Sequence, residues 1–468
     1  MKDIIRTPTP YTEVSIMNAY EEFRKRVERL RILDNAYFTG RTGREDKKAK
    51  LTVNYCKYIS DTKAAFVAGI PPAYEADSND AKGQEIVEAF DEQTLPRLDQ
   101  QLIKDASRYG RAVEVEYMEE EDGRLIPRST QVSPLDGFIA YDQTLNPKPV
   151  FGAIHYAYKN DDGTVDDYLD VYDDTQVVRY RLTGPEGSSS WVEVPGSRRL
   201  HGFQSVPMIE YLNNPDGIGD FEPVLDEQTS LNEMLSDRIK DKNRFASAIL
   251  VAQGFVLGDT DEEVNESMGQ LKEDEYISIP RDAGLNYLVK TFDEASVQIL
   301  VDDVTTNIHK ITGIPDLSDE NFASNTSGVA MKYKLLGLLN IAQSVEAEFR
   351  RGFRTRCALY SGAMFGDSGA DVRKMDIRFR FNLPTDPSFE AQSLQIFIQN
   401  GLLSRETALA YVPYVDDVAE ELKRIEAEEQ VKAERQRQAE EDLIDKELRK
   451  MRGQGDDEEP VPEDEDEI

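Results

Sequence analysis

Apolar residues recur at helical spacing along the first part of the chain. Residues 11–38, 54–68 and 79–109 each predict an amphipathic helix. A Gly-x-Pro-Pro sequence that begins at Gly69 ends the second of these helices, because glycine and proline interrupt a helical backbone. The first hundred residues are therefore expected to be mainly helical.

The pattern changes between residues 111 and 214. Short runs rich in Val, Tyr and Ile, such as VEVEYM, FGAIHYAY and QVVRYRL, alternate with polar turn sequences. Two of these turns contain Asp122-Gly123 and Asp162-Gly163, which favour tight hairpins. This region predicts an antiparallel sheet built from hairpins.

Two more amphipathic helices are predicted over 224–250 and 293–312, and they flank an insert of mixed short elements at 253–292. A helix with one apolar face packs against another element through that face. The apolar stripe of the first helix is Leu225, Leu231, Leu235, Ile239, Ala246 and Ile249, and that of the second is Val297, Leu300, Val301, Val304, Ile308 and Ile311.

A polar loop follows Gly313, and a long helix is expected from 327 to 363. At ~1.5 Å per residue this helix would be about 50 Å long. A strand-like run at 376–383 and a helical region at 387–411 come next, and 416–451 predicts a highly charged helix. The last thirteen residues contain nine acidic and no basic residues, so they are expected to be disordered.

The composition limits the classes of function. A chain of 468 residues predicts two or more modules. Its net charge of −35 is unlike that of a free-standing DNA-binding protein, which needs Lys and Arg to hold phosphates. Such acidity suits simple solubility, and it also suits a surface that stays near DNA without binding it.

Cys56 and Cys357 are the two cysteines, and one widely spaced pair predicts buried thiols in a reducing compartment. The N-terminus lacks the apolar core of a signal peptide, and no apolar run approaches the roughly 18 residues that span a membrane. We therefore expect a soluble protein that is made in a cytoplasm.

Enzyme motifs are missing or isolated. No G-x-x-x-x-G-K-[ST] sequence is present to bind a nucleotide phosphate. Ser60-x-x-Lys63 lacks its companion motifs, and acidic pairs such as Asp302-Asp303 arise by chance among 90 acidic residues. None of the histidines has a second ligand at metal-binding spacing; they are His155, His201 and His309. We predict no enzyme activity, no metal and no cofactor.

Three stretches, taken together, resemble one protein family. GIPDLSDENFASNTSGVAMKYKLLGL at 313–338, NYCKYISDTKAAFVAGIPPAYEAD at 54–77 and GLLSRETALAYVPYVDDVAEELKRIEAEE at 401–429 occur in the order found in that family. They are similar to the portal, or head-to-tail connector, proteins of tailed double-stranded DNA bacteriophages. The resemblance is greatest to the portals of long-tailed phages of Gram-positive hosts.

The resemblance implies an α+β, mainly helical portal fold, assembled as a ring. A wing and a crown are joined to a stem of two helices, and a small α/β clip lies between those helices. The expected parts are the wing at 1–223, the first stem helix at 224–252, the clip at 253–292, the second stem helix at 293–312, the tunnel loop at 313–326, the long helix and the rest of the wing at 327–400, the crown at 401–455 and a disordered acidic tail at 456–468.

The resemblance also implies a function. Portal subunits form a ring of about a dozen copies at one capsid vertex, a dodecamer here, by contacts that close on themselves. Double-stranded DNA is packaged and later ejected through the channel. The expected partners are the terminase, a head-completion adaptor, and the major capsid and scaffolding proteins, with no membrane. The expected location is the virion, after assembly in the host cytoplasm.

Three sets of candidate site residues follow. The tunnel loop would face DNA through polar side chains that form transient hydrogen bonds with phosphates; these are Ser318, Asp319, Glu320, Asn321, Ser324, Asn325 and Thr326. Lys332 and Lys334 would contact DNA or a neighbouring subunit. Glu262, Glu263 and Glu273 in the clip would bind partners. Asn325 and Thr326 are equally suited to capping the next helix, and the clip acids to keeping the insert soluble.

Two other classes of function stay open at this stage. A nucleic-acid enzyme would need an acidic cluster that binds metal. A coiled-coil scaffold would suit the charged helix at 416–451, but it leaves the strand-rich middle of the chain unexplained.

Overall fold

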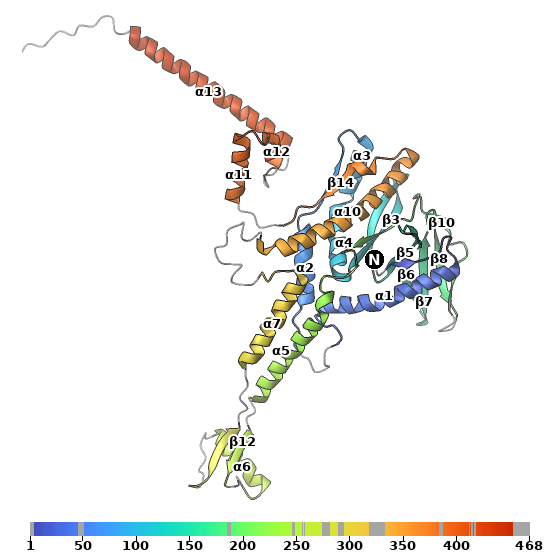
Figure 1. The fold of residues 1–468 in the computed structure, drawn as a ribbon, viewed down its shortest axis with the longest axis vertical. Coiled ribbons are helices and arrows are strands. Elements are labelled where there is room, and N and C mark those ends of the chain that lie inside the picture. Colours follow the sequence, from blue (N-terminus) through green and yellow to red (C-terminus); the bar gives the residue numbers. More distant parts are fainter. Residues whose placement is uncertain are drawn as a thin grey trace, which may run out of the picture. The chain divides into compact units, whose positions relative to one another are not determined.

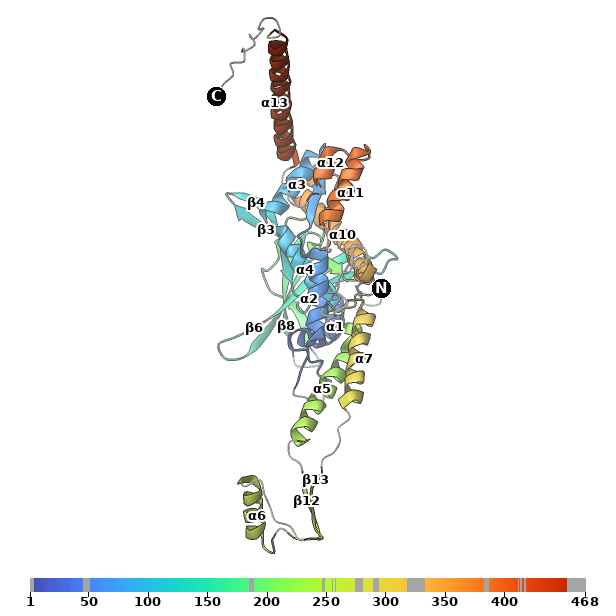
Figure 2. The same ribbon diagram turned by 90° about the vertical axis from the view of Figure 1, so that its left-hand side faces the viewer.

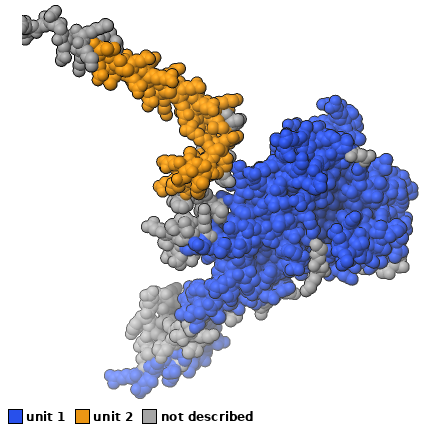
Figure 3. All heavy atoms as spheres, turned by 45° about the horizontal axis from the view of Figure 1, so that its top comes forward, with its two compact units in different colours: residues 1–384 blue, residues 385–468 orange. Residues whose placement is uncertain are grey.

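Helices and sheets both contribute to the fold, with helices in the majority, which confirms the predicted α+β class (Figure 1). The chain divides into two units, residues 1–384 and 385–468, which are coloured separately in Figure 3. The computed structural model describes residues 4–44, 51–184, 189–245, 249–254, 256, 258–273, 281–288, 294–317, 333–382, 387–410, 412, 415 and 418–452.

Helix α1 (Glu13–Thr39) packs on a seven-stranded sheet. Phe23 of α1 stacks on Phe138 with ring centroids 4.5 Å apart, and Tyr20 meets the edge of Trp191 at 4.9 Å. The strand order is β1-β5-β6-β7-β8-β10 with β9 paired to β8, and β1 is parallel to β5 while the other pairs are antiparallel. The strands are β1 (Ile5–Arg6), β5 (Gly137–Tyr141), β6 (Pro149–Lys159), β7 (Val165–Tyr172), β8 (Gln176–Thr183), β9 (Ser190–Glu193) and β10 (Arg199–Leu200).

A second antiparallel sheet has the order β11-β3-β4 and packs against the long helix α10 (Leu336–Phe365) and against α4 (Leu95–Tyr109). Its strands are β3 (Arg111–Glu121), β4 (Arg124–Val132) and β11 (Met208–Leu212). The predicted antiparallel hairpins between 111 and 214 are therefore confirmed. Helix α10 is about 45 Å long by its 30 residues.

The helix predicted over 79–109 is in fact two helices, α3 (Ala81–Glu92) and α4 (Leu95–Tyr109), and the single-helix prediction is wrong. Thr94 has a φ of 55°, a left-handed backbone conformation that ends regular helix. Pro96 then lies in the first turn of α4, where a proline needs no hydrogen-bond donor. Helix α2 (Tyr55–Ala68) has the predicted extent.

Two segments far apart in sequence pair in a small antiparallel sheet, β2 (Ala73–Ala76) with β14 (Met375–Arg378). The described residues also contain three short 3₁₀ turns, at Glu222–Val224, Gly366–Ser368 and Val372–Lys374. The strand pair places the segment after α10 beside the segment after α2.

Helices α5 (Leu225–Phe245) and α7 (Glu294–Thr312) lie side by side (Figures 1 and 2). Arg238 and Lys242 of α5 contact the Glu294 carboxylate at 2.8 and 3.4 Å. Between the two helices the chain forms β12 (Ile249–Gln253), α6 (Asp261–Glu273) and β13 (Gly284–Leu288), with β12 antiparallel to β13.

The first stem helix, expected over 224–252, is shorter than predicted. It ends at Phe245, and residues 249–253 form a strand instead. The short apolar run ILVA fits a helix and a strand equally by its pattern. Pairing with β13 decides between them, because Ile249 lies opposite Leu288 in the antiparallel register.

Residues 385–468 form the second unit, which contains α11 (Pro387–Gln399), α12 (Arg405–Ala410) and α13 (Val418–Arg452). The region at 387–411 is thus divided into two helices, with Gly401 in the left-handed conformation at a φ of 66°. Arg405 contacts Glu429 at 2.7 Å and joins α12 to α13. The charged helix predicted over 416–451 is present as α13.

Candidate functional site: the loop that follows α7

The loop between α7 and α10 begins at Gly313, whose φ of 66° turns the chain out of the helix. The structure describes the loop as far as Leu317. The predicted DNA-facing residues Ser318, Asp319, Glu320, Asn321, Ser324, Asn325 and Thr326, and also Lys332, lie outside the described residues. Their contact with DNA therefore stays a prediction. The described part of the loop, residues 313–317, shows how its start is held.

Two side chains hold the start of this loop by its backbone. The Tyr58 hydroxyl of α2 donates to the Pro315 carbonyl at 3.0 Å and accepts the Leu317 N–H at 3.2 Å. The His309 ring of α7 bonds to the Ile314 carbonyl through Nδ1 at 2.9 Å. Backbone groups of three residues in a stretch of four are thus bound by side chains from two different helices.

The Ile314 carbonyl can only accept a hydrogen bond, so Nδ1 of His309 carries the proton. Nε2 of the same ring is buried without a hydrogen-bond partner and faces the Asp316 carboxylate at 3.8 Å. The rings of Tyr55 and Tyr58 meet the imidazole edge-on, at centroid distances of 5.7 and 5.9 Å. These contacts fix the orientation of the His309 ring.

His309 lines two open hollows, of about 570 and 480 Å³. Lys334, one of the predicted contact residues, is exposed and lines the larger hollow together with Asp302, Lys310 and Asp316. Its position near the loop suits the predicted contact with DNA or a neighbouring subunit, and that contact stays a prediction.

The apolar stripes of α5 and α7 divide into an inner and an outer part. Leu231 and Ile308 are buried in the core of the unit. Ile239, Leu300 and Ile311 remain exposed to 40, 55 and 50%. Exposure of large apolar side chains at several places on one helix pair is typical of a surface that another molecule covers.

The clip candidates lie on α6. Glu262 and Glu263 are exposed in its first turn, where carboxylates interact favourably with the helix dipole. Glu263 also accepts the Asp259 N–H at 2.8 Å, while Thr260 accepts the Glu263 N–H at 3.3 Å, so Glu263 has a helix-capping role. Glu273 ends α6, and its side chain lies outside the described residues.

The isolated enzyme motif has a structural explanation. Ser60 hydrogen-bonds to Ser107 at 2.9 Å, while Lys63 donates to Asn213 and Asp220, each at 2.7 Å. Serine and lysine are therefore bound to different partners, and burial lowers the pKa of Lys63 while Asp220 raises it. The Ser-x-x-Lys match has no catalytic geometry.

Among the described residues, no three His, Cys, Asp or Glu side chains are grouped so that they could hold a metal ion. Both cysteines are buried, and no disulfide joins them. In the same part of the chain, no helix combines the length and apolarity needed to cross a membrane.

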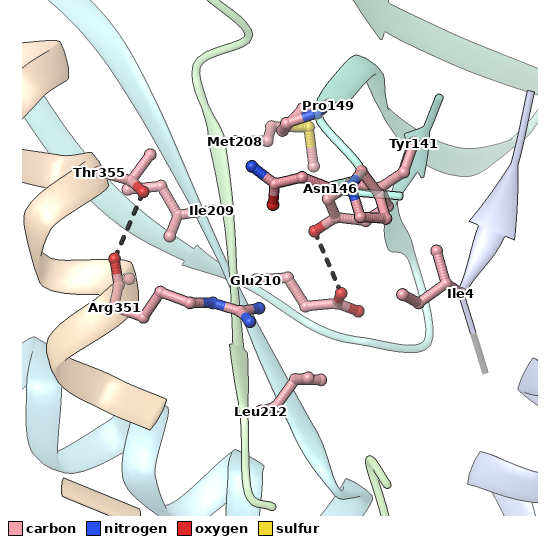
Figure 4. Close-up of a pocket in the computed structure, with 12 residues that line it drawn as sticks. Ile4, Tyr141, Asn146, Pro149, Met208, Ile209, Glu210, Leu212, Arg351 and Thr355 are labelled. Carbon is pink, nitrogen blue, oxygen red and sulfur yellow. Dashed lines mark hydrogen bonds between the residues drawn. The ribbon is translucent and has the colours of Figure 1, made fainter. Parts of the chain in front are cut away.

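A cavity of about 260 Å³ lies between α10 and β11 (Figure 4). Its acidic wall is Glu210, which accepts hydrogen bonds from Arg111 at 2.6 Å and from Tyr141 at 3.3 Å. The carboxylate is thus engaged in holding strands together. Thr355 likewise bonds to the backbone of its own helix, at the Arg351 carbonyl. Both side chains therefore have structural contacts.

Sequence patterns did not indicate the two residues that hold the loop. The sequence pattern assigns no role to His309, because no second ligand lies at metal-binding spacing. Tyr58 lies within the stretch 54–77 that carries the family resemblance, and this was the available signal. A hydrogen bond between residues 58 and 317 joins segments whose proximity no local pattern encodes.

Comparison with known proteins agrees with the resemblance. The family model described as "Phage portal protein, SPP1 Gp6-like" matches residues 15–435. The protein named "Portal protein" of Bacillus phage SPP1 is 23% identical over 390 residues, which cover 80% of this chain and 74% of that protein. Because the family match extends over most of the chain, this protein belongs to the phage portal protein family.

Proposed function

We propose that copies of this chain form a closed ring at one capsid vertex, and that double-stranded DNA passes through it during packaging and ejection. The observation that carries this proposal is the exposed apolar surface of α5 and α7, which includes Ile239, Leu300 and Ile311. A neighbouring copy would cover it, and head-to-tail contacts of one kind close into a ring. The chain itself would have a structural, non-enzymatic role, and ATP hydrolysis would belong to the terminase.

The charge of the chain suits a conduit. Lys and Arg along a channel would hold phosphates through counterion release and would slow the passage of DNA. A chain with a net charge of −35 would instead repel the phosphates and let the DNA pass. The loop that begins at Gly313 would approach the duplex with polar residues that carry little positive charge.

Electron microscopy and sedimentation of the purified protein test the proposal. We expect rings with a central hole at micromolar concentration and moderate salt. The double variant Leu300→Lys/Ile311→Lys should give monomers, because it places charges in the contact. Monomers alone for the unaltered chain would reject the ring proposal.

The insert between α5 and α7 would serve as the clip and would bind the terminase and then the head-completion adaptor. Charge reversal at Glu262, with or without reversal at Glu273, should weaken partner binding to intact rings. Glu263→Lys is a poorer test, because that carboxylate also caps α6. Full binding after removal of the entire insert from intact rings would reject this role.

The tunnel-loop role is tested by deletion of residues 319–323. Rings should still form, because the apolar surfaces of α5 and α7 are unchanged, while packaged DNA per particle should fall sharply. Normal packaging by the shortened chain would leave the loop as a plain connector.

A further inference from the structure

We propose that Tyr58 and His309 act together as positioning residues, through which the wing helix α2 and the stem helix α7 jointly set the direction of the loop that follows Gly313. This inference rests on the proposed function, because it assigns a control to the loop that is proposed to face DNA. Its consequence is that the loop's reach depends on the spacing between α2 and α7.

The Tyr58 end of the anchor belongs to the wing. Helix α2 is fixed at its start, where Asn54 accepts the Lys57 N–H at 2.9 Å and Gln228 accepts the Tyr55 N–H at 3.2 Å. Farther along α2, Ile59 and Val67 are completely buried. Tyr58 therefore moves with the wing core and not with the loop.

The His309 end belongs to the stem. Its ring lies in the last turn of α7, four residues before Gly313. Thr312 closes the same turn, since its hydroxyl donates to the Ile308 carbonyl at 2.8 Å, and Ile308 is buried. The bond from His309 to the Ile314 carbonyl thus ties the first loop residues to α7.

The two attachments act on adjacent backbone groups. His309 binds residue 314, and Tyr58 binds residues 315 and 317. A shift of α7 against α2 must therefore break one attachment or carry the loop with it. A device of this kind would couple the loop to a change between wing and stem.

Tyr58→Phe tests the inference, because it keeps the ring against His309 and removes the hydroxyl that binds the loop. Tyr55→Phe is the matched control: Tyr55 lies on the same helix, meets the same imidazole, and its hydroxyl bonds to Thr305 of α7 and not to the loop. Both variants are studied as assembled rings.

The first measurement is amide hydrogen exchange at Leu317. Loss of its acceptor should accelerate exchange about tenfold in Tyr58→Phe and leave it unchanged in Tyr55→Phe. The second measurement is packaged DNA per particle, which should fall in Tyr58→Phe alone. A role in stability only would lower the melting temperature without this difference in packaging.

Unchanged exchange at Leu317, normal packaging despite faster exchange, or equal packaging loss in both variants would each overturn the inference. If Tyr58→Phe does not assemble, His309→Phe decides, since it removes the bond to Ile314 and keeps an aromatic ring; normal packaging by its rings would then overturn the inference. Failure of the unaltered chain to form rings would instead reject the proposed function.

Discussion

Arg356 of α10 and Glu114 of β3 form an ion pair at 2.9 Å, and both side chains are completely buried. The same guanidinium contacts Asp99 of α4 at 2.6 Å, and Tyr211 of β11 donates to Glu114 at 2.6 Å. One cation thus joins the long helix to a helix and a sheet. Burial raises the pKa of Glu114, and the charge of Arg356 opposes that rise.

Arg356→Met should destabilise the fold by about 3–5 kcal/mol, because it leaves two carboxylates buried without their cation. Arg351→Met is the control, since Arg351 lies on the same helix but is exposed and contacts Glu348 only at 3.9 Å. Chemical denaturation of both variants measures the difference. Equal shifts in the two unfolding midpoints would show that the buried ion pair contributes no more to stability than the exposed contact of Arg351.

The stability of the fold should depend on Asp105 in mildly acidic solution. Burial raises the pKa of Asp105 from 3.8 to about 6, while the charge of Arg108 and a hydrogen bond from Gln131 oppose the rise. Because the pKa of Asp105 is raised in the folded state, the protonated carboxyl group favours folding. Its contribution to the free energy of unfolding is present below about pH 4 and is lost as the pH rises through about 6.

Asp105→Asn should therefore remove up to about 3 kcal/mol of pH dependence between pH 4 and 7. Asp142→Asn provides a contrast of opposite sign, because hydrogen bonds from Thr144 lower the pKa of Asp142 and its contribution is lost as the pH falls. Denaturation midpoints between pH 4 and 7 measure the effect of Asp105→Asn, and midpoints below about pH 4 measure that of Asp142→Asn. If the stability of Asp105→Asn depended on pH as steeply as that of the unaltered protein, this would contradict a raised pKa of Asp105.

Local patterns predicted those elements whose residues are governed by local spacing. Helix α1 agrees with apolar periodicity, and the hairpins β3–β4 and β6–β7 agree with the Asp-Gly turns. Local spacing does not indicate the break at Thr94, because the apolar spacing continues through it while its left-handed backbone separates α3 from α4.

The parts that could not be predicted depend on contacts between distant segments. A lone arginine in a helix indicates a solvated residue, yet Arg356 is buried because Asp99 and Glu114 reach it from elements more than two hundred residues away. The same reason explains why the hydrogen bonds of Tyr58 to the loop were missed. The candidate DNA-facing residues came from resemblance, and no pattern fixed their geometry.

Helix α5 presents a buried polar stripe toward the segment that precedes α2. Asn232 accepts the Val53 N–H at 3.0 Å and donates to the Gly40 carbonyl at 2.8 Å. Gln228 and Ser236, one turn to either side, bind the same segment at Tyr55 and Leu51. The stripe replaces a neighbouring strand as the hydrogen-bond partner of this extended backbone.

Asn232→Leu should destabilise the protein by about 1–3 kcal/mol, because the Val53 N–H would stay buried without this acceptor. Ser230→Ala on the exposed side of α5 is the control, since its hydroxyl bonds only to the Asp226 carbonyl within the same helix. Exchange of the Val53 amide should accelerate in the first variant and not in the second. Retained protection of that amide would refute the proposed role of the stripe.

Two glycines of α10 give a test of packing in which the expected effects have opposite signs. A methyl group at Gly352 would lie 2.3 Å from a ring carbon of Tyr211. That ring cannot yield, because Tyr211 is completely buried, stacks on Phe349 at 4.4 Å and holds Glu114 through its hydroxyl. At Gly362 the nearest atom is in the flexible Gln204 side chain, at an ordinary 3.7 Å.

Gly352→Ala should therefore destabilise the fold by about 1–3 kcal/mol, since α10 must move away from β11 and loosen the Arg356 contacts behind it. Gly362→Ala should stabilise it by up to about 1 kcal/mol, because alanine favours the helical backbone and meets no obstacle. Thermal unfolding of the two single variants compares them directly. Stabilisation in both variants would show that Tyr211 leaves room for a methyl group at Gly352, and would contradict close packing of the long helix on the sheet.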